Sequence, residues 1–65
     1  MQRVFSSAIS AVGYDTQTKR MKIVFTNGRV YDFCGVPDYV HLGLMTAASK
    51  GQYYNDFIRD RYQCF

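Results

Sequence analysis

The chain has 65 residues, of which 48% are hydrophobic and 17% aromatic, and its formal net charge at pH 7 is +3. A chain of this length forms one small domain, residues 1–65, which buries only about 60% of its unfolded surface and has few side chains to spare for a deep substrate cavity. The composition excludes disorder, no apolar run reaches the roughly 20 residues of a membrane span, and no secretory signal is recognisable at the N-terminus. We therefore expect a soluble cytoplasmic protein.

The first strand is predicted over residues 7–14, Ser-Ala-Ile-Ser-Ala-Val-Gly-Tyr. Gly13 within this run indicates a bulge or a close approach of another backbone segment. The polar run that follows at residues 15–19, Asp-Thr-Gln-Thr-Lys, is short enough to connect antiparallel neighbours.

Residues 20–33, Arg-Met-Lys-Ile-Val-Phe-Thr-Asn-Gly-Arg-Val-Tyr-Asp-Phe, predict a β-hairpin. Two alternating runs flank Asn27-Gly28, the pair that most readily adopts φ > 0. A two-residue loop would place Asp32 on the apolar face that carries Ile23. A three-residue loop with Gly28 as a left-handed bulge shifts the pairing by one residue and leaves that face wholly apolar. It pairs Met21 with Phe33, Lys22 with Asp32, Ile23 with Tyr31, and Val24 with Val30. We predict this bulged register.

Two helices are predicted after the hairpin. Pro37 suits the first helical turn, and Asp38 complements the positive end of the helix dipole. Apolar residues then recur at helical spacing, namely Val40, Leu44, Met45 and Ala48. We predict one helix over residues 37–48, ended by Gly51 as a left-handed cap, and a second helix over residues 52–62.

The simplest way to bury all these apolar stripes is one small sheet covered on one face by two helices. We therefore predict an α+β domain with a three-stranded, rather than four-stranded, antiparallel meander sheet, followed by two helices packed on one face (β-β-β-α-α). The residues expected to form the buried cluster are Ile23, Phe25, Tyr31, Val40, Leu44, Phe57 and Ile58.

A series of short motifs extends over residues 6–62. They are Ser6-Ser7, Val12-Gly13-Tyr14-Asp15, Tyr31-Asp32-Phe33, Val36-Pro37, Ser49-x-Gly51-x-Tyr53-Tyr54-Asn55, Ile58-Arg59 and Tyr62. Their order and spacing resemble the KTSC domain, a family named for its occurrence at the C-terminus of some lysyl-tRNA synthetases and also found as short stand-alone proteins. Members typically carry Tyr-x-Tyr at the end of the hairpin, whereas Phe33 here lacks the second hydroxyl. The resemblance implies RNA binding, which the synthetase context suggests. The family has no established activity.

The inventory of reactive side chains does not support an enzyme. His41 is the single histidine and lies in the middle of a predicted helix, so nothing in the spacing supplies Cys34 or Cys64 with a base and a third orienting group. The sequence has no Cys-x-x-Cys or His-x-x-x-His, and two thiols with one imidazole fall short of a closed zinc site. We predict no catalytic residue, no metal, no cofactor and no small-molecule substrate.

The two cysteines are too few for a disulfide framework. Together with the missing secretory signal, they indicate reduced thiols in a cytoplasm. A single disulfide between Cys34 and Cys64 is the alternative, since their separation in sequence does not forbid contact.

Basic residues are concentrated in the first part of the chain. Residues 1–30 hold five basic residues and one acidic residue, a net charge of +4, whereas residues 31–65 have a net charge of −1. Basic side chains on a hairpin concentrate positive potential, and neighbouring aromatic rings could stack on exposed bases of RNA or another nucleic acid. The alternative is that these cations only keep the sheet soluble and protect its edges. The candidate contacts to nucleic acid are Lys19, Arg20, Lys22, Arg29 and Arg59.

A protein-interaction adaptor or a homodimer is the second hypothesis. A three-stranded sheet leaves two exposed edges, and an apolar strip on its outer face could seat a partner or a second copy. Arg and Tyr on the last helix are also favoured at interfaces, although an ion pair with Asp56 or Asp60 would explain the same residues. The candidate protein contacts are Val24, Val30, Tyr53, Arg59 and Arg61. Salt distinguishes the hypotheses, because phosphate binding weakens steeply with ionic strength.

Overall fold

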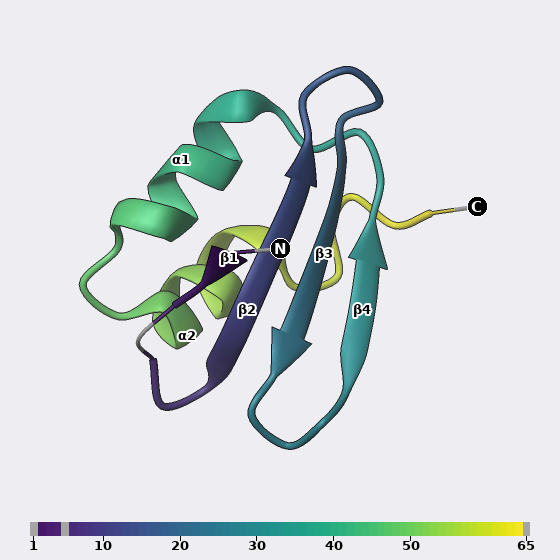
Figure 1. Ribbon diagram of the computed structural model, residues 1–65. Coiled ribbons are helices and arrows are strands. Elements are labelled where there is room, and N and C mark those ends of the chain that lie inside the picture. The colour runs from purple at the N-terminus through teal and green to yellow at the C-terminus, as the bar shows by residue number, and fades with distance from the viewer. Residues whose placement is uncertain (1, 5, 65) are drawn as a thin grey trace.

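In the computed structural model, which describes residues 2–4 and 6–64, the strands form one antiparallel sheet in the order β1-β2-β3-β4 (Figure 1). The strands are β1 (Gln2–Arg3), β2 (Ile9–Asp15), β3 (Arg20–Phe25) and β4 (Val30–Phe33). The predicted meander of three strands is confirmed in β2, β3 and β4. The short β1 adds a fourth strand at the β2 edge, so the expectation of only three strands was wrong. The two residues of β1 are too few to show the alternation of apolar and polar side chains that predicts a strand. Only their pairing with β2 identifies them as one.

The hairpin between β3 and β4 has the predicted bulged register. Lys22 pairs with Asp32 and Ile23 with Tyr31, as the three-residue loop requires. Gly28 has a φ of 89°, and its N–H donates a 3.0 Å hydrogen bond to the carbonyl of Phe25. Only glycine adopts this backbone conformation without a steric penalty, so the turn sequence itself sets the register.

The bulge in β2 lies at Ser10 and not at Gly13. The register between β2 and β3 shifts between Ile9 and Ala11, whereas Gly13 pairs regularly with Lys22. The Ser10 hydroxyl donates a 3.2 Å hydrogen bond to the carbonyl of Val24. A bulge of this kind increases the local twist of a strand.

The helical part consists of α1 (Asp38–Thr46), α2 (Lys50–Tyr53) and the π-helix η1 (Tyr54–Ile58), which continues directly from α2. α1 begins after Pro37 as predicted but ends before Ala47, which has extended backbone. Gly51 lies inside α2 and is not a left-handed cap. The second helix ends at Ile58, so its predicted extension to Tyr62 was wrong.

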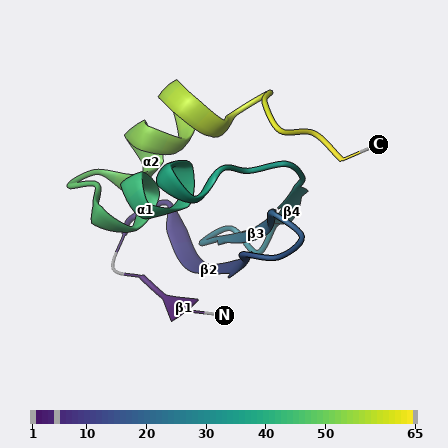
Figure 2. The same ribbon diagram turned by 90° about the horizontal axis from the view of Figure 1, so that it is seen from above.

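Both helices cover the same face of the sheet, and the opposite face carries no helix (Figure 2). The buried side chains between the two layers are Ile9, Val12, Met21, Ile23, Phe33, Val36, Val40, Leu44 and Ile58. Phe25 is only half-buried, Tyr31 is 42% exposed and Phe57 is 51% exposed. The prediction that these three belong to the buried cluster was therefore wrong for Tyr31 and Phe57. None of the helices in the described residues is long and apolar enough to cross a membrane.

The two cysteines are joined in a disulfide, so the prediction of reduced thiols was wrong. Cys34 directly follows β4, and Cys64 lies at the end of a segment that returns to the same strand; their Cα atoms are 4.9 Å apart. Phe33 forms an isolated antiparallel bridge with Gln63. The fold brings the end of β4 and the C-terminal segment together, which the spacing of the cysteines could not reveal.

Candidate nucleic-acid interface

Lys19, a predicted nucleic-acid contact, belongs to a hydrogen-bonded cluster where the β2–β3 turn meets α1. Its Nζ is 2.7 Å from Asp38 Oδ1, which also accepts a 2.7 Å hydrogen bond from the Tyr14 hydroxyl. The hydrogen bond from Lys19 lowers the pKa of Asp38, and burial together with the Asp38 contact raises the pKa of Tyr14 to about 12. The Lys19 carbonyl accepts a further bond from the N–H of Val36. Lys19 therefore ties the turn to the helix, and its charge is already balanced.

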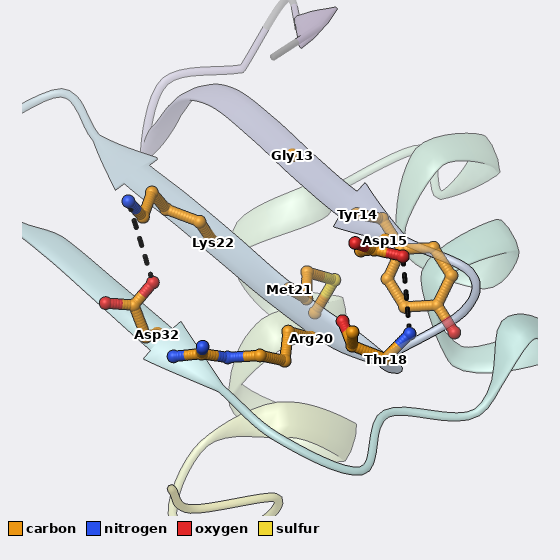
Figure 3. Close-up of a pocket in the computed structure, with 8 residues that line it drawn as sticks. All are labelled: Gly13, Tyr14, Asp15, Thr18, Arg20, Met21, Lys22 and Asp32. Atoms are coloured by element: carbon orange, nitrogen blue, oxygen red, sulfur yellow. Dashed lines mark hydrogen bonds and ion pairs between the residues drawn. The ribbon is translucent and has the colours of Figure 1, made fainter.

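Arg20 and Lys22 lie on the sheet face that no helix covers, among charges of both signs (Figure 3). They face Asp15 and Asp32 across the strands, and Lys22 Nζ is 3.9 Å from Asp32 Oδ1, the pair predicted from the register. These side chains, together with Gly13, line a shallow hollow of about 540 Å³. A phosphate placed there would meet carboxylates as well as cations, so this face is a poor anion site.

Arg29 and Arg59 line one pocket although they are far apart in the sequence. Arg29 follows the hairpin turn and lies next to β4, and Arg59 directly follows η1. The pocket has a volume of about 250 Å³, and we call it the arginine–tyrosine pocket. Its lining residues are Phe25, Asn27, Arg29, Tyr31, Tyr54, Asn55 and Arg59.

Three aromatic rings, those of Phe25, Tyr31 and Tyr54, are among the side chains that line this pocket. Tyr54 contacts Phe25 and Phe33 edge to face, with ring centroids 5.0 and 6.0 Å apart, and Tyr31 contacts Phe25 in the same way at 5.5 Å. Burial raises the pKa of Tyr54, nearby Tyr31 raises it further, and Arg59 opposes the shift. Tyr31 is the exposed member of this group, so its ring is available to a ligand.

The two arginines of the pocket are less neutralised than the lysines. Arg29 Nη1 contacts the hydroxyl of Tyr31 at 3.4 Å, and none of the ion pairs among the described residues involves Arg29. Arg59 Nε is 4.0 Å from Asp60 Oδ2, but the two side chains are 64% and 87% exposed, so water screens this pair. Guanidinium groups beside an exposed aromatic ring can hold a phosphate while the ring stacks on a base.

Neither tyrosine was predicted to contact nucleic acid, because Tyr31 was assigned to the core and Tyr54, beside Arg59, was considered only as part of a protein interface. One signal was available for Tyr31. Arg29 and Tyr31 are two residues apart, and side chains at that spacing point to the same side of an extended strand. An arginine and a tyrosine on one side at the end of a strand are a reasonable basis for predicting a ligand surface.

The candidate protein contacts do not form one surface. Val24 and Val30 pair on the uncovered sheet face, where Val30 is 50% exposed. Tyr53 lies on the helical side and packs on Phe57 with ring centroids 4.7 Å apart, and Arg61 belongs to the C-terminal segment. The sequence analysis did not single out the most exposed apolar side chains of α1, which are Tyr39 at 72% and Leu42 at 63%.

The residues weighed for catalysis or metal binding have other environments. His41 stacks on Tyr14 with ring centroids 4.5 Å apart, and burial lowers its pKa. Cys34 and Cys64 are joined to each other. Among residues 2–4 and 6–64, no three His, Cys, Asp or Glu side chains gather as a metal site would require.

The architecture defines a small α+β domain in which a meander sheet is covered on one face by two helices. Residues 5–62 match the KTSC domain family. The chain belongs to this family.

Similar proteins include stand-alone chains and parts of longer ones. The crystal structure of a KTSC domain protein from Yersinia pestis superimposes with a TM-score of 0.92 at 34% identity, covering 98% of this chain and 90% of that one. A protein from Tsukamurella paurometabola is 38% identical over 97% of this chain and 94% of its own length. A lysine–tRNA ligase from Nostoc punctiforme is 37% identical over 88% of this chain, which spans only 10% of that enzyme.

Proposed function

We propose that this KTSC domain is a non-enzymatic module that binds single-stranded RNA through the arginine–tyrosine pocket. The observation that carries the proposal is the convergence of Arg29 and Arg59 on a pocket with an exposed tyrosine ring, Tyr31. The guanidinium groups would hold consecutive phosphates, and the ring would stack on the base between them. Because a base must be unstacked to reach the ring, a single strand suits this site better than a duplex.

The lysine–tRNA ligase from Nostoc punctiforme supports an RNA ligand, since its name includes an RNA and a stretch of it is 37% identical to this chain. Relatives of similar length support an accessory role for a protein of this kind.

The expected affinity follows from the small number of contacts. Sequence-independent binding of this kind has a Kd of roughly 10⁻⁴–10⁻⁶ M at physiological salt. With two phosphate contacts on a single strand, log K should fall against log salt concentration with a slope of about −1.4.

The test is a titration of labelled single-stranded RNA, tRNA and duplex DNA at two salt concentrations. Arg29→Glu should abolish measurable binding and Tyr31→Leu should weaken it by roughly tenfold, because a stacked base contributes about 1–3 kcal/mol. Arg3→Glu is the matched control: it makes the same charge change on β1, at the opposite edge of the sheet from β4. If none of the nucleic acids binds the unaltered protein at low salt, the proposal is wrong.

A second candidate is a protein-binding role for α1, favoured by the exposure of Tyr39 and Leu42. Exposed aromatic and aliphatic side chains on one helix are typical of an interaction surface. Binding there would change little with salt and would survive Arg29→Glu. It would instead be lost in Leu42→Ser, which leaves the pocket intact.

A further inference from the structure

The C-terminal segment, residues 59–64, is attached to β4 by a small number of contacts. The N–H of Cys34 donates a 2.7 Å hydrogen bond to the carbonyl of Tyr62, and Phe33 bridges to Gln63. The Tyr62 side chain packs against the core from outside. The disulfide between Cys34 and Cys64 is the one covalent link that keeps this segment on the strand.

The backbone of this segment is unfavourable without such a link. Asp60 has a φ of 61° and Tyr62 a φ of 54°, and neither is a glycine. The left-handed region is disfavoured for residues with a Cβ, and for a residue as large as tyrosine it requires support from the surroundings. A segment with two such residues and few contacts is expected to leave this conformation when the covalent link is broken.

The disulfide is accessible to reductants, because Cys64 is exposed and Cys34 is only half-buried. Reduction by a dithiol begins when a thiolate of the reductant attacks Cys64 Sγ, so that the S–S bond breaks and Cys34 leaves as a thiolate that takes up a proton. The second thiol of the reductant then displaces Cys64. Two electrons and two protons are transferred, giving two cysteine thiols and the disulfide of the reductant.

We propose that the Cys34–Cys64 disulfide is a redox-controlled clasp that fixes the C-terminal segment and, with it, the position of Arg59 in the arginine–tyrosine pocket. Arg59 is the first residue of the segment, and its N–H donates the closing 2.8 Å bond of η1 to the carbonyl of Tyr54. Control of the pocket rests on the proposed RNA-binding function, whereas the clasp itself does not. The oxidised protein holds Arg59 in place for a phosphate, and the reduced protein leaves it mobile.

The clasp is tested by ¹⁵N relaxation of the protein before and after treatment with dithiothreitol. In the oxidised protein, the amides of Arg61, Gln63 and Cys64 should have order parameters near 0.85; after reduction they should fall below about 0.6, while the β3 amides stay rigid. Cys64→Ser should resemble the reduced protein and should not respond to dithiothreitol. An unchanged segment in the reduced protein overturns the clasp. So does a reduced protein that is wholly unfolded, because the disulfide would then stabilise the whole domain rather than one segment.

The control of the pocket is tested separately by titrating single-stranded RNA into the oxidised and reduced proteins. Losing the fixed position of one arginine should weaken binding by roughly threefold to tenfold. Equal affinities in the two states overturn the control of the pocket, even if the segment is released. Absence of binding in both states overturns the proposed function and its redox control, whereas the relaxation result still decides the clasp.

Discussion

Leu44 is one of the two buried side chains of α1, with Val40, and its truncation tests the packing of the helix on the sheet. The side chain is fully buried, with 0% exposure, and belongs to the cluster that the helices and the sheet share. Leu44→Ala removes buried methyl and methylene groups and leaves a cavity, which costs about 2–5 kcal/mol in the free energy of unfolding. A domain of this length has a total stability of roughly 3–10 kcal/mol, so most of it is at stake.

The assay is urea denaturation followed by circular dichroism, with thermal unfolding as a second measurement. Each kcal/mol lost should lower the Tm by roughly 4–8 °C in so small a domain. Leu42→Ala is the matched control, because Leu42 lies on the same helix and is 63% exposed; its effect should stay within about 0.5 kcal/mol. Leu44→Met preserves most of the volume and should cost less than about 1.5 kcal/mol.

The order of these variants is the decisive result. Leu44→Ala should be the most destabilised, Leu44→Met intermediate and Leu42→Ala close to the unaltered protein. Equal effects of Leu44→Ala and Leu42→Ala, or an unchanged urea midpoint for Leu44→Ala, would show that α1 presents a different face to the sheet.

Three further predictions concern the hairpin and the cluster at the start of α1. Gly28→Val should cost more than about 1 kcal/mol in urea denaturation, since a β-branched residue fits the left-handed turn poorly, whereas Gly28→Asn should cost less. The pKa of Tyr14 is raised from 10.0 to about 12, so the contribution of the Tyr14 hydroxyl to stability should be lost as the pH rises through this interval. Subtracting the tyrosinate titration of Tyr14→Phe from that of the unaltered protein gives the titration of Tyr14 alone. A midpoint near 10 would contradict the structure. The pKa of Asp38 is lowered from 3.8, so the stabilising effect of its carboxylate is present above pH 3.8 and is lost as the pH falls through the lowered value. Asp38→Asn should flatten this dependence of the unfolding free energy on acid pH. An unchanged pH dependence would count against the ion pair with Lys19.

The hairpin could be predicted from the sequence because its signals are local. Asn27-Gly28 sets the turn, and the requirement for one apolar face excludes the register that would turn Asp32 inward. The start of the first helix was predictable for the same reason, since Pro37 fixes the backbone where the helix begins.

The end of the second helix could not be predicted from α-helical spacing. In η1 the N–H of Arg59 bonds to the carbonyl of Tyr54, five residues earlier, which places more residues in each turn than an α-helix has. The wider turn changes the directions in which the following side chains point, so Ile58 lies in the core and Phe57 is exposed to solvent. Tertiary packing, rather than local propensity, determines this geometry.

The candidate site was predicted only in part, because the sequence shows where charges lie along the chain but not which charges lie together in the folded protein. In the folded chain the excess of positive charge in residues 1–30 is partly neutralised, because Lys19 and Lys22 pair with carboxylates of residues 31–65. The pocket depends on the meeting of Arg29 with Arg59, which only the folded chain brings about.

The most direct test of the central claim is a titration of single-stranded RNA into ¹⁵N-labelled oxidised protein, followed by NMR chemical shifts. The shifts that change most should belong to Arg29, Tyr31, Tyr54 and Arg59, whereas those of Arg3 on the opposite edge should stay in place. Three results would contradict the assignment of the arginine–tyrosine pocket as an RNA-binding site. They are shift changes confined to Arg20 and Lys22 on the uncovered sheet face, shift changes confined to Tyr39 and Leu42 on α1, and no shift change at low salt.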